Sequence, residues 1–546
     1  MKHSFCCLAA AFFFFHTMAQ EPARLAADGR LLVDGKPFIM LAGEIHNSAS
    51  SSRSWLEATW ETLASMHMNT VLAPVSWEQL EPEEGVFDDE CIDRLIATAE
   101  HYDMRLVILW FGTWKNGQSS YAPLWVKTDT GRFFRTRLVD GTLTDTISPF
   151  CEAALEADTR AFVHLMNYIR ERDTRRLVTM IQVQNEIGAF QDLDYGEAGM
   201  KAFNGQVPSQ LTAWLNRHKE TLYPALAEHW TGIMNGTWTE VFGDSKEARQ
   251  FCMSWAFASY VNHLASSGKA IHRLPMFVNA WLTDDGHRLA GFPNGGPVHK
   301  VIDIYKAAAP AIDLCCPDIY DPDFKQYCQL YHRADNFLLI PETVRDAAPA
   351  FYALAEHDAI CFSPFAIEDA YDDDFFVGSY GVLEELMPLI AQYQGTGLMR
   401  GFLKQGEETH EELILGKYVF EINYIKEEKK GFGLIIKTDD DAFIIAGFGA
   451  TVHVKSLEEG LIARFTHVND GHLEKGEWKA DGLLNGDQTD HNRVLYLRGR
   501  MIYPSHAGIP APSPNVAVSE KALQKVLGRK RIPGIYKAWV YTYPKK

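Results

Sequence analysis

Cysteine is scarce in this sequence and is not arranged for cross-linking. Nine cysteines occur in 546 residues, and Cys6 and Cys7 lie in the N-terminal apolar run. The others are an odd, sparse set, unlike the even, closely spaced cysteines of small disulfide-rich domains. Several lie in apolar segments, where free cysteine packs as a small hydrophobic residue: Cys91, Cys151, Cys252, Cys315, Cys316, Cys328 and Cys361. Because paired Cys-x-x-Cys motifs and a His-Glu-x-x-His motif are also missing, we expect no metal and no cofactor.

Positive charge and long apolar runs are lacking too. The net charge is −19, which repels phosphate backbones and anionic bilayers and so argues against nucleic-acid or membrane-surface partners. After the N-terminus no segment approaches the 18 or so apolar residues of a membrane-spanning helix, so we expect no membrane insertion.

The N-terminus has the features of a secretory signal peptide. Lys2 and His3 precede an apolar run at residues 5–15, which is too short to span a bilayer. Thr17-Met18-Ala19 offers tolerable residues for cleavage, so residues 1–19 are predicted to be removed. The mature protein is then exported, to the periplasm or outside the cell.

The chain from residue 20 to about residue 400 alternates strand-like and helix-like segments. The strand-like segments are continuous apolar runs, as expected for parallel strands covered on both faces. Eight such units in one block predict a (β/α)8 TIM barrel. The predicted strands are 38–46, 70–77, 105–114, 178–186, 276–281, 314–320, 337–342 and 359–367.

The pattern changes near residue 400. From residue 401 to 546, short strand-like segments are separated by turn residues such as Asn469-Asp470-Gly471. This pattern predicts a smaller, all-β, sandwich-like domain. No low-complexity linker precedes it, so we expect it to pack directly against the barrel, either to brace it or to bind glycan itself.

Two glutamates end predicted barrel strands. Glu186 follows Asn185 at the end of the fourth strand, and Glu342 ends the seventh. Strands four and seven lie nearly opposite in an eight-stranded barrel, and side chains at the C-terminal strand ends face the active site. Two carboxyl groups flanking one bond are what glycoside hydrolysis requires. Glu186 is predicted to be the acid/base and Glu342 the nucleophile.

Other residues at strand ends complete a candidate substrate-binding set. Asn185 is suited to bind the sugar 2-hydroxyl, and Tyr320 to donate a hydrogen bond that keeps Glu342 ionised. His46 is a sugar contact or a structural residue, and each tryptophan is a sugar platform or rim packing. The remaining members of the set are His46, Trp77, Trp114, Lys115, Asn116 and Trp281.

Several motifs resemble glycoside hydrolase family 35, the β-galactosidases of the retaining clan A. Gly43-Glu44-Ile45-His46 is similar to that family's Gly-x-Ile-His, and residues 69–87 to its Asn-Thr…Trp…Glu-Pro-x-x-Gly-x-Phe. Residues 182–188 match five of the seven positions of Gln-(Val/Ile)-Glu-Asn-Glu-Tyr-Gly, and residues 122–126 resemble its Pro-x-Trp-Leu segment. The resemblance covers about residues 25–540.

Departures from the family pattern are also clear. Gln184 and Ile187 replace Glu and Tyr, and the third strand ends in Thr113-Trp114-Lys115-Asn116 instead of an Ala-Glu pair. This form resembles a bacterial subgroup whose C-terminal β domain has no assigned function; residues 448–449 and 483–487 are similar to pieces of it.

The resemblance implies an exo-acting retaining β-galactosidase. Its subgroup implies terminal β-D-galactosyl residues of plant cell-wall oligosaccharides or polysaccharides, such as xyloglucan, as substrate. The alternatives are a β-glucosidase, α-L-arabinopyranosidase or β-glucosaminidase, or a carbohydrate-binding protein on an inactive barrel. A homodimer is left open.

Overall fold

The computed structural model describes residues 21–282, 291–484, 486–502 and 530–545. The predicted signal peptide, residues 1–19, lies outside the described residues. Eight parallel strands form one sheet in the order β12-β11-β10-β9-β6-β5-β4-β13. A parallel bridge joins Ile340, which lies just before β12, to Phe362 of β13. The two edges of the sheet therefore meet, and the sheet closes into the predicted barrel. The strands are β4 (Met40–Glu44), β5 (Thr70–Ser76), β6 (Arg105–Lys115), β9 (Val178–Asn185), β10 (Met276–Trp281), β11 (Leu314–Ile319), β12 (Glu342–Thr343) and β13 (Cys361–Phe362).

The barrel strands are apolar throughout because both of their faces are buried. In β5, Leu72 packs inside the barrel, while its neighbours Val71 and Ala73 pack outward in the helix-facing core. The seventh and eighth strands are shorter than predicted. Pro341 has no N–H to donate to a strand ladder, so regular pairing of the seventh strand begins only at Glu342.

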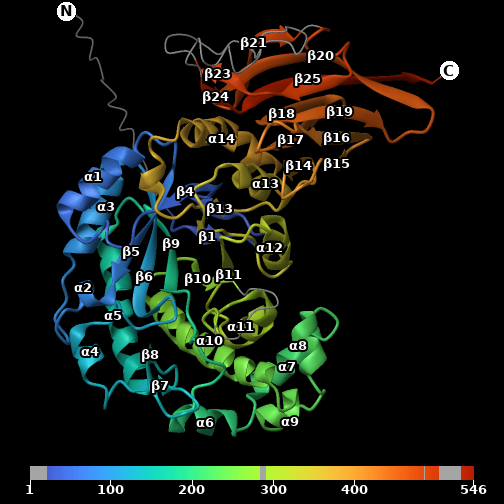
Figure 1. The fold of residues 1–546 in the computed structure, drawn as a ribbon. Helices are drawn as coiled ribbons and strands as arrows, with labels where there is room; N and C mark the ends of the chain where they lie inside the picture. The colour runs from blue at the N-terminus through green and yellow to red at the C-terminus, as the bar shows by residue number, and fades with distance from the viewer. Residues whose placement is uncertain (1–20, 283–290, 485, 503–529, 546) are drawn as a thin grey trace, which may run out of the picture.

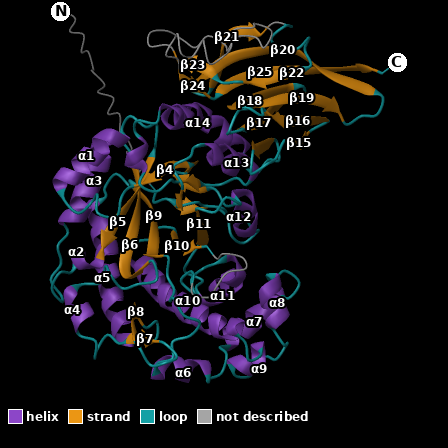
Figure 2. Ribbon diagram, viewed as in Figure 1, coloured by secondary structure: helices purple, strands orange, loops and turns teal. Residues whose placement is uncertain are grey.

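Helices surround the barrel (Figure 2). They are α1 (Arg53–Leu63), α2 (Trp77–Leu80), α3 (Glu90–Tyr102), α5 (Glu152–Arg172), α10 (Lys246–Ile271), η1 (His299–Val301), α11 (Ile302–Ala308), α12 (Phe324–Tyr331), α13 (Ala348–Glu356), η2 (Ile367–Ala370) and α14 (Asp374–Tyr393). Longer insertions follow β6 and β9. They contain α4 (Leu124–Thr128), β7 (Arg135–Arg137), β8 (Leu143–Ile147), α6 (Glu197–Phe203), α7 (Ser209–His218), α8 (Pro224–His229) and α9 (Trp238–Phe242).

A three-stranded antiparallel sheet precedes the barrel, and its Leu31 and Val33 pack against the barrel interior. It consists of β1 (Arg24–Leu25), β2 (Leu31–Val33) and β3 (Lys36–Pro37). In the part of the chain that the structure describes, no helix is both long enough and apolar enough to cross a bilayer.

The C-terminal segment is all-β, as predicted. A six-stranded sheet, in the order β14-β17-β18-β25-β20-β21, contains β14 (Met399–Leu403), β17 (Phe432–Asp439), β18 (Ala442–Phe448), β20 (Leu461–Glu474), β21 (Glu477–Leu484) and β25 (Gly534–Pro544). A four-stranded sheet contains β15 (His410–Leu415), β16 (Tyr418–Tyr424), β19 (Ala450–Ser456) and β22 (Val494–Leu497). A separate pair is formed by β23 (Arg500–Ile502) and β24 (Lys530–Ile532). Side chains from both large sheets share one apolar core, so the domain is a sandwich.

The sandwich packs directly on the barrel, as the missing linker predicts. Figure 1 shows it lying against α13 and α14. Along β17, Ile435 faces the sandwich core, whereas Leu434 and Ile436 belong to the core shared with the barrel helices. Because residues 432–436 of β17 are covered on both faces, they are continuously apolar, unlike the alternating strand β16 of the four-stranded sheet.

Candidate active site

Carboxyl groups from three barrel strands gather in one pocket. Glu186 directly follows β9, Asp318 lies near the end of β11, and Glu342 begins the two-residue β12. Asp318 and Glu342 are paired in register on neighbouring strands. The pocket has a volume of about 480 Å³ and is lined by Asn116, Glu186, Trp281, Leu282, Gly291, Asp318, Tyr320, Asp321, Pro322 and Glu342.

The backbone around Glu186 is strained. Gln184 and Glu186 have φ values of 66° and 44°, in the left-handed region that non-glycine residues rarely adopt. The Glu186 N–H donates to Asn279 Oδ1 at 2.9 Å, which helps to hold this conformation. Gly188 (φ 141°) then lets the chain pass Pro293, where a Cβ would lie 2.5 Å from backbone atoms. Strain of this kind, maintained by surrounding contacts, is common at functional sites.

Glu342 is held by the residue predicted to hold it. Tyr320 Oη donates to Glu342 Oε1 at 2.5 Å. The other oxygen, Oε2, is buried and has no hydrogen-bond partner in the described part of the chain. Burial and the adjacent Glu342 raise the pKa of Tyr320, so the phenol stays protonated and acts as the donor. Glu342 therefore has one oxygen fixed and one oxygen free.

Two of these carboxyl groups, Glu186 and Asp318, have raised pKa values. Burial, and then the charge of Glu342, raise the pKa of Glu186 to about 8, whereas Lys115 acts in the opposite direction. Burial, and then the charges of Glu342 and Glu186, raise the pKa of Asp318. With a pKa of about 8, Glu186 is a carboxylic acid at neutral pH, as a general acid must be.

Lys115 and Asn185 form a buried pair beside the acids. Lys115 Nζ donates to Asn185 Oδ1 at 3.0 Å and lies 4.6 Å from the centroid of the Phe111 ring. The Asn185 Nδ2 amide is buried and has no hydrogen-bond partner among the described residues. Lys115 thus fixes the orientation of the amide. Among the described residues, neither Lys115 nor Asn185 is part of the lining of the pocket, so both predicted contacts lie buried beside it.

Part of the barrel matches a known family. Residues 30–221 match the model of the family described as glycosyl hydrolases family 35. The chain resembles that family over about a third of its length. Residues 376–495 match a second model, described as a domain of unknown function (DUF5597). The protein is therefore a glycoside hydrolase that carries a C-terminal domain without an assigned role.

The comparison with solved structures finds several hydrolases at low identity. The β-galactosidase of Bacillus circulans sp. alkalophilus is 13% identical with a TM-score of 0.44, and the match covers 66% of this chain and 57% of that one. The β-galactosidase of Halorubrum lacusprofundi is 15% identical with a TM-score of 0.43, and the match covers 63% of this chain and 58% of that one. The β-amylase catalytic domain of Paenibacillus polymyxa is 10% identical with a TM-score of 0.43, and the match covers 61% of this chain and 93% of that one. The chain thus spans less than two thirds of either β-galactosidase. No curated protein matches the sequence.

Two of the three predicted tryptophan platforms are wrong for this hydrolase. Trp77 is fully buried, and its Nε1 donates to Glu81 Oε2 at 2.8 Å. Trp114 is also fully buried, and its Nε1 donates to the Ile147 carbonyl at 2.9 Å. Neither ring has a face left for a sugar. Trp281, which is 38% exposed, lines the pocket and is the one of the three placed to stack on a ligand.

The remaining predicted contacts are divided between the pocket and its surroundings. Asn116 lines the pocket. His46 follows β4 and is half-exposed; its Nε2 lies 3.1 Å from Asp369 Oδ2, and its backbone N–H donates to Glu368 Oε1. In the described part of the chain, His46 is not among the residues that line the pocket.

Asp318 and Glu44 belong to the acidic centre of the hydrolase but are missing from the predicted set. Glu44 is fully buried, and neither of its oxygens has a hydrogen-bond partner among the described residues. Burial and the charge of Glu342 raise its pKa well above the usual value. The sequence does contain a signal for Asp318. It lies two residues before Tyr320 at the end of a strand, so the two side chains lie on the same face of the sheet. Among the described residues, no cluster of acidic, His or Cys side chains is arranged to hold a metal.

Proposed function

We propose that this hydrolase is an exo-acting, exported β-galactosidase. It removes terminal β-D-galactosyl residues from plant cell-wall oligosaccharides or polysaccharides, with retention, through a covalent galactosyl-enzyme. The observation that carries the proposal is the convergence of Glu186 and Glu342, 156 positions apart in the sequence, on one 480 Å³ pocket. The choice of galactose rests on the family motifs.

The proposed reaction has two displacement steps. In the first, Glu342 Oε2 forms a bond to the anomeric carbon while the bond to the leaving oxygen breaks, and Glu186 gives its proton to that oxygen. In the second, Glu186 takes a proton from water, which attacks the anomeric carbon and releases Glu342. Since the charge of Glu342 helps to raise the pKa of Glu186, forming the ester removes that charge and prepares Glu186 to act as a base.

A panel of 4-nitrophenyl glycosides tests the proposal. We expect the β-D-galactoside to have a kcat/KM at least ten times that of the β-D-glucoside, α-L-arabinopyranoside and β-D-glucosaminide. Proton NMR during the first minutes should show β-galactose before mutarotation, because two inversions retain configuration. A different preferred sugar would correct the specificity, α-galactose would contradict retention, and a wild type inert on every glycoside would favour a binding protein.

The dependence on pH follows from the Glu186 pKa of about 8. A general acid with a raised pKa is protonated, and active, below that pKa and loses its proton above it. We therefore expect kcat/KM to remain level through neutrality and to fall about tenfold per pH unit above about pH 8. Initial rates on a methyl β-galactoside from pH 5 to 10 measure this. A decline beginning near pH 5 would contradict the assignment, because an unshifted glutamic acid titrates there.

A further inference from the structure

A second cavity adjoins the active-site pocket. It has a volume of about 350 Å³, and Tyr320, Asp321 and Pro322 line both cavities. Its barrel side continues along Val344, Asp346 and Pro349. Its opposite side comes from two loops of the C-terminal sandwich, residues 403–406 and 429–431. Both loops lie within the domain of unknown function.

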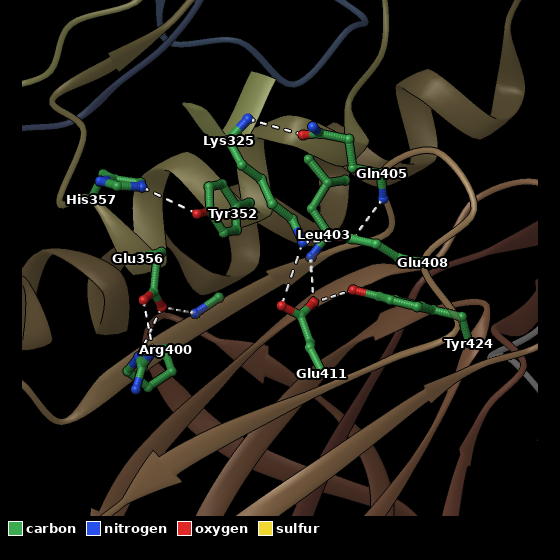
Figure 3. Close-up of polar contacts among 11 residues, drawn as sticks. Lys325, Tyr352, Glu356, His357, Arg400, Leu403, Gln405, Glu408, Glu411 and Tyr424 are labelled. Atoms are coloured by element: carbon green, nitrogen blue, oxygen red, sulfur yellow. Dashed lines mark hydrogen bonds and ion pairs between the residues drawn. The ribbon is translucent and has the colours of Figure 1, made fainter. Parts of the chain in front are cut away.

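The sandwich side of this cavity is fixed to the barrel by charged contacts (Figure 3). Lys325 Nζ, from α12, lies 2.8 Å from Glu408 Oε2 and 3.5 Å from Glu411 Oε2. Glu356, at the end of α13, accepts two hydrogen bonds from the Arg400 guanidinium, at 2.7 and 2.8 Å.

Two further contacts lie at the cavity itself. The Gln405 side chain accepts from the Lys325 N–H at 3.1 Å and donates to Asp323 at 3.0 Å. Lys430 Nζ lies 2.7 Å from Asp346 Oδ1. These contacts add to an apolar interface that α13 forms with β14 and β17. The two loops are therefore held in place as one side of the cavity.

The lining suits a sugar ring. Val344 is 43% exposed and, with Pro322 and Pro349, offers apolar surface to ring C–H groups. Lys404 and Lys429 line the cavity from the sandwich, and Lys404 Nζ donates to the Glu428 carbonyl at 3.1 Å. Lys429 is exposed and makes no ion pair in the described part of the chain, so it is available to sugar oxygens. Apolar surface with a few polar groups is the usual composition of a small-ligand site.

We propose that this cavity is a leaving-group subsite, which binds the sugar attached to the reacting galactosyl unit. The inference rests on the proposed function and gives the C-terminal domain a role in substrate selection. Tyr320 is common to both cavities, and its hydroxyl is fixed on Glu342. A disaccharide reaching past Tyr320 therefore has its reacting sugar beside Glu186 and Glu342, and its second sugar between Val344 and the lysines.

The test compares substrates that differ only in the second sugar. Methyl β-galactoside fills the catalytic pocket alone, whereas β-galactosyl disaccharides with 1→2, 1→4 and 1→6 links also reach the second cavity. We expect the wild type to show a kcat/KM at least ten times higher on one of these disaccharides than on the methyl glycoside. In the Lys404→Ala/Lys429→Ala double variant, this ratio should fall at least fivefold.

Lys426 and Lys475 provide the matched control. Both are exposed, and Lys426 belongs to the same loop as Lys429, but neither lines the cavity. The Lys426→Ala/Lys475→Ala variant should keep the wild-type ratio. An unchanged ratio in the cavity variant, or an equal fall in the control, would overturn the subsite while leaving the β-galactosidase proposal intact. If the aryl panel identifies another sugar, the same pairs are made with that sugar; a wild type inert on every glycoside overturns both proposals.

Discussion

The Glu342→Gln variant should lose hydrolysis of 4-nitrophenyl β-galactoside almost completely, with kcat lower by roughly 10⁴-fold or more. In the wild type, the free Oε2 is buried and unpartnered while Tyr320 holds Oε1. An amide is nearly the same size and still accepts the Tyr320 hydrogen bond, but its nitrogen is not a nucleophile at the anomeric carbon. The loss should therefore appear in kcat without loss of folding, which circular dichroism checks.

Chemical rescue makes the assignment of Glu342 specific. In a Glu342→Gly variant, azide can enter the emptied space and displace the leaving group in a single inversion, so the product should be α-galactosyl azide. The Glu412→Gln variant is the control, because Glu412 is exposed on β15 in the sandwich, and it should keep wild-type activity. Wild-type activity in Glu342→Gln, or β-galactosyl azide from Glu342→Gly, would remove Glu342 from the role of nucleophile.

The barrel could be predicted because its strands and helices have different apolar patterns. Eight apolar runs of strand length, separated by helix-length segments, leave few alternatives to a closed parallel barrel. The lengths of the last two strands could not be predicted. Residues 338–340 are apolar and hydrogen-bond to the eighth strand, but Pro341 interrupts the ladder just before Glu342.

Site residues could be predicted where a polar residue ends an apolar strand. They could not be predicted where the burial of a side chain depends on segments distant in the sequence. Glu186 and Glu342 stand out because a carboxylate is unusual at the end of a buried run. A tryptophan is compatible with either a core or a sugar platform. Trp114 is covered by Phe257 and Tyr260 of α10, more than 140 positions away in the sequence, and no local pattern reveals this contact.

One departure from the family motif has a structural explanation. Gln184 replaces the family's Glu, and its side chain bridges two buried groups. Its Nε2 donates to Asp158 Oδ2 at 2.6 Å, and its Oε1 accepts from the Trp114 N–H at 2.9 Å. A carboxylate at this position could not donate to Asp158 and would repel it. The exchange of Glu for Gln therefore matches the presence of Asp158, and it positions the strained turn that presents Glu186.

The Glu186→Ala variant should show a loss that depends on the leaving group. Proton donation is worth about 10²–10⁴-fold to a poor leaving group. We therefore expect kcat/KM on methyl β-galactoside to fall by about that factor and on 2,4-dinitrophenyl β-galactoside to change far less, because dinitrophenolate departs without a proton. The decline above about pH 8 should also disappear, since it belongs to Glu186.

Azide separates the role of Glu186 from that of Glu342. With Glu186 removed, Glu342 still forms the galactosyl-enzyme from the dinitrophenyl substrate, and azide then attacks that ester without needing a general base. Two inversions give β-galactosyl azide, the opposite anomer to that expected from Glu342→Gly. An equal loss on both leaving groups would show that Glu186 acts on something other than the departing oxygen, and the strained turn after β9 would then require a different explanation.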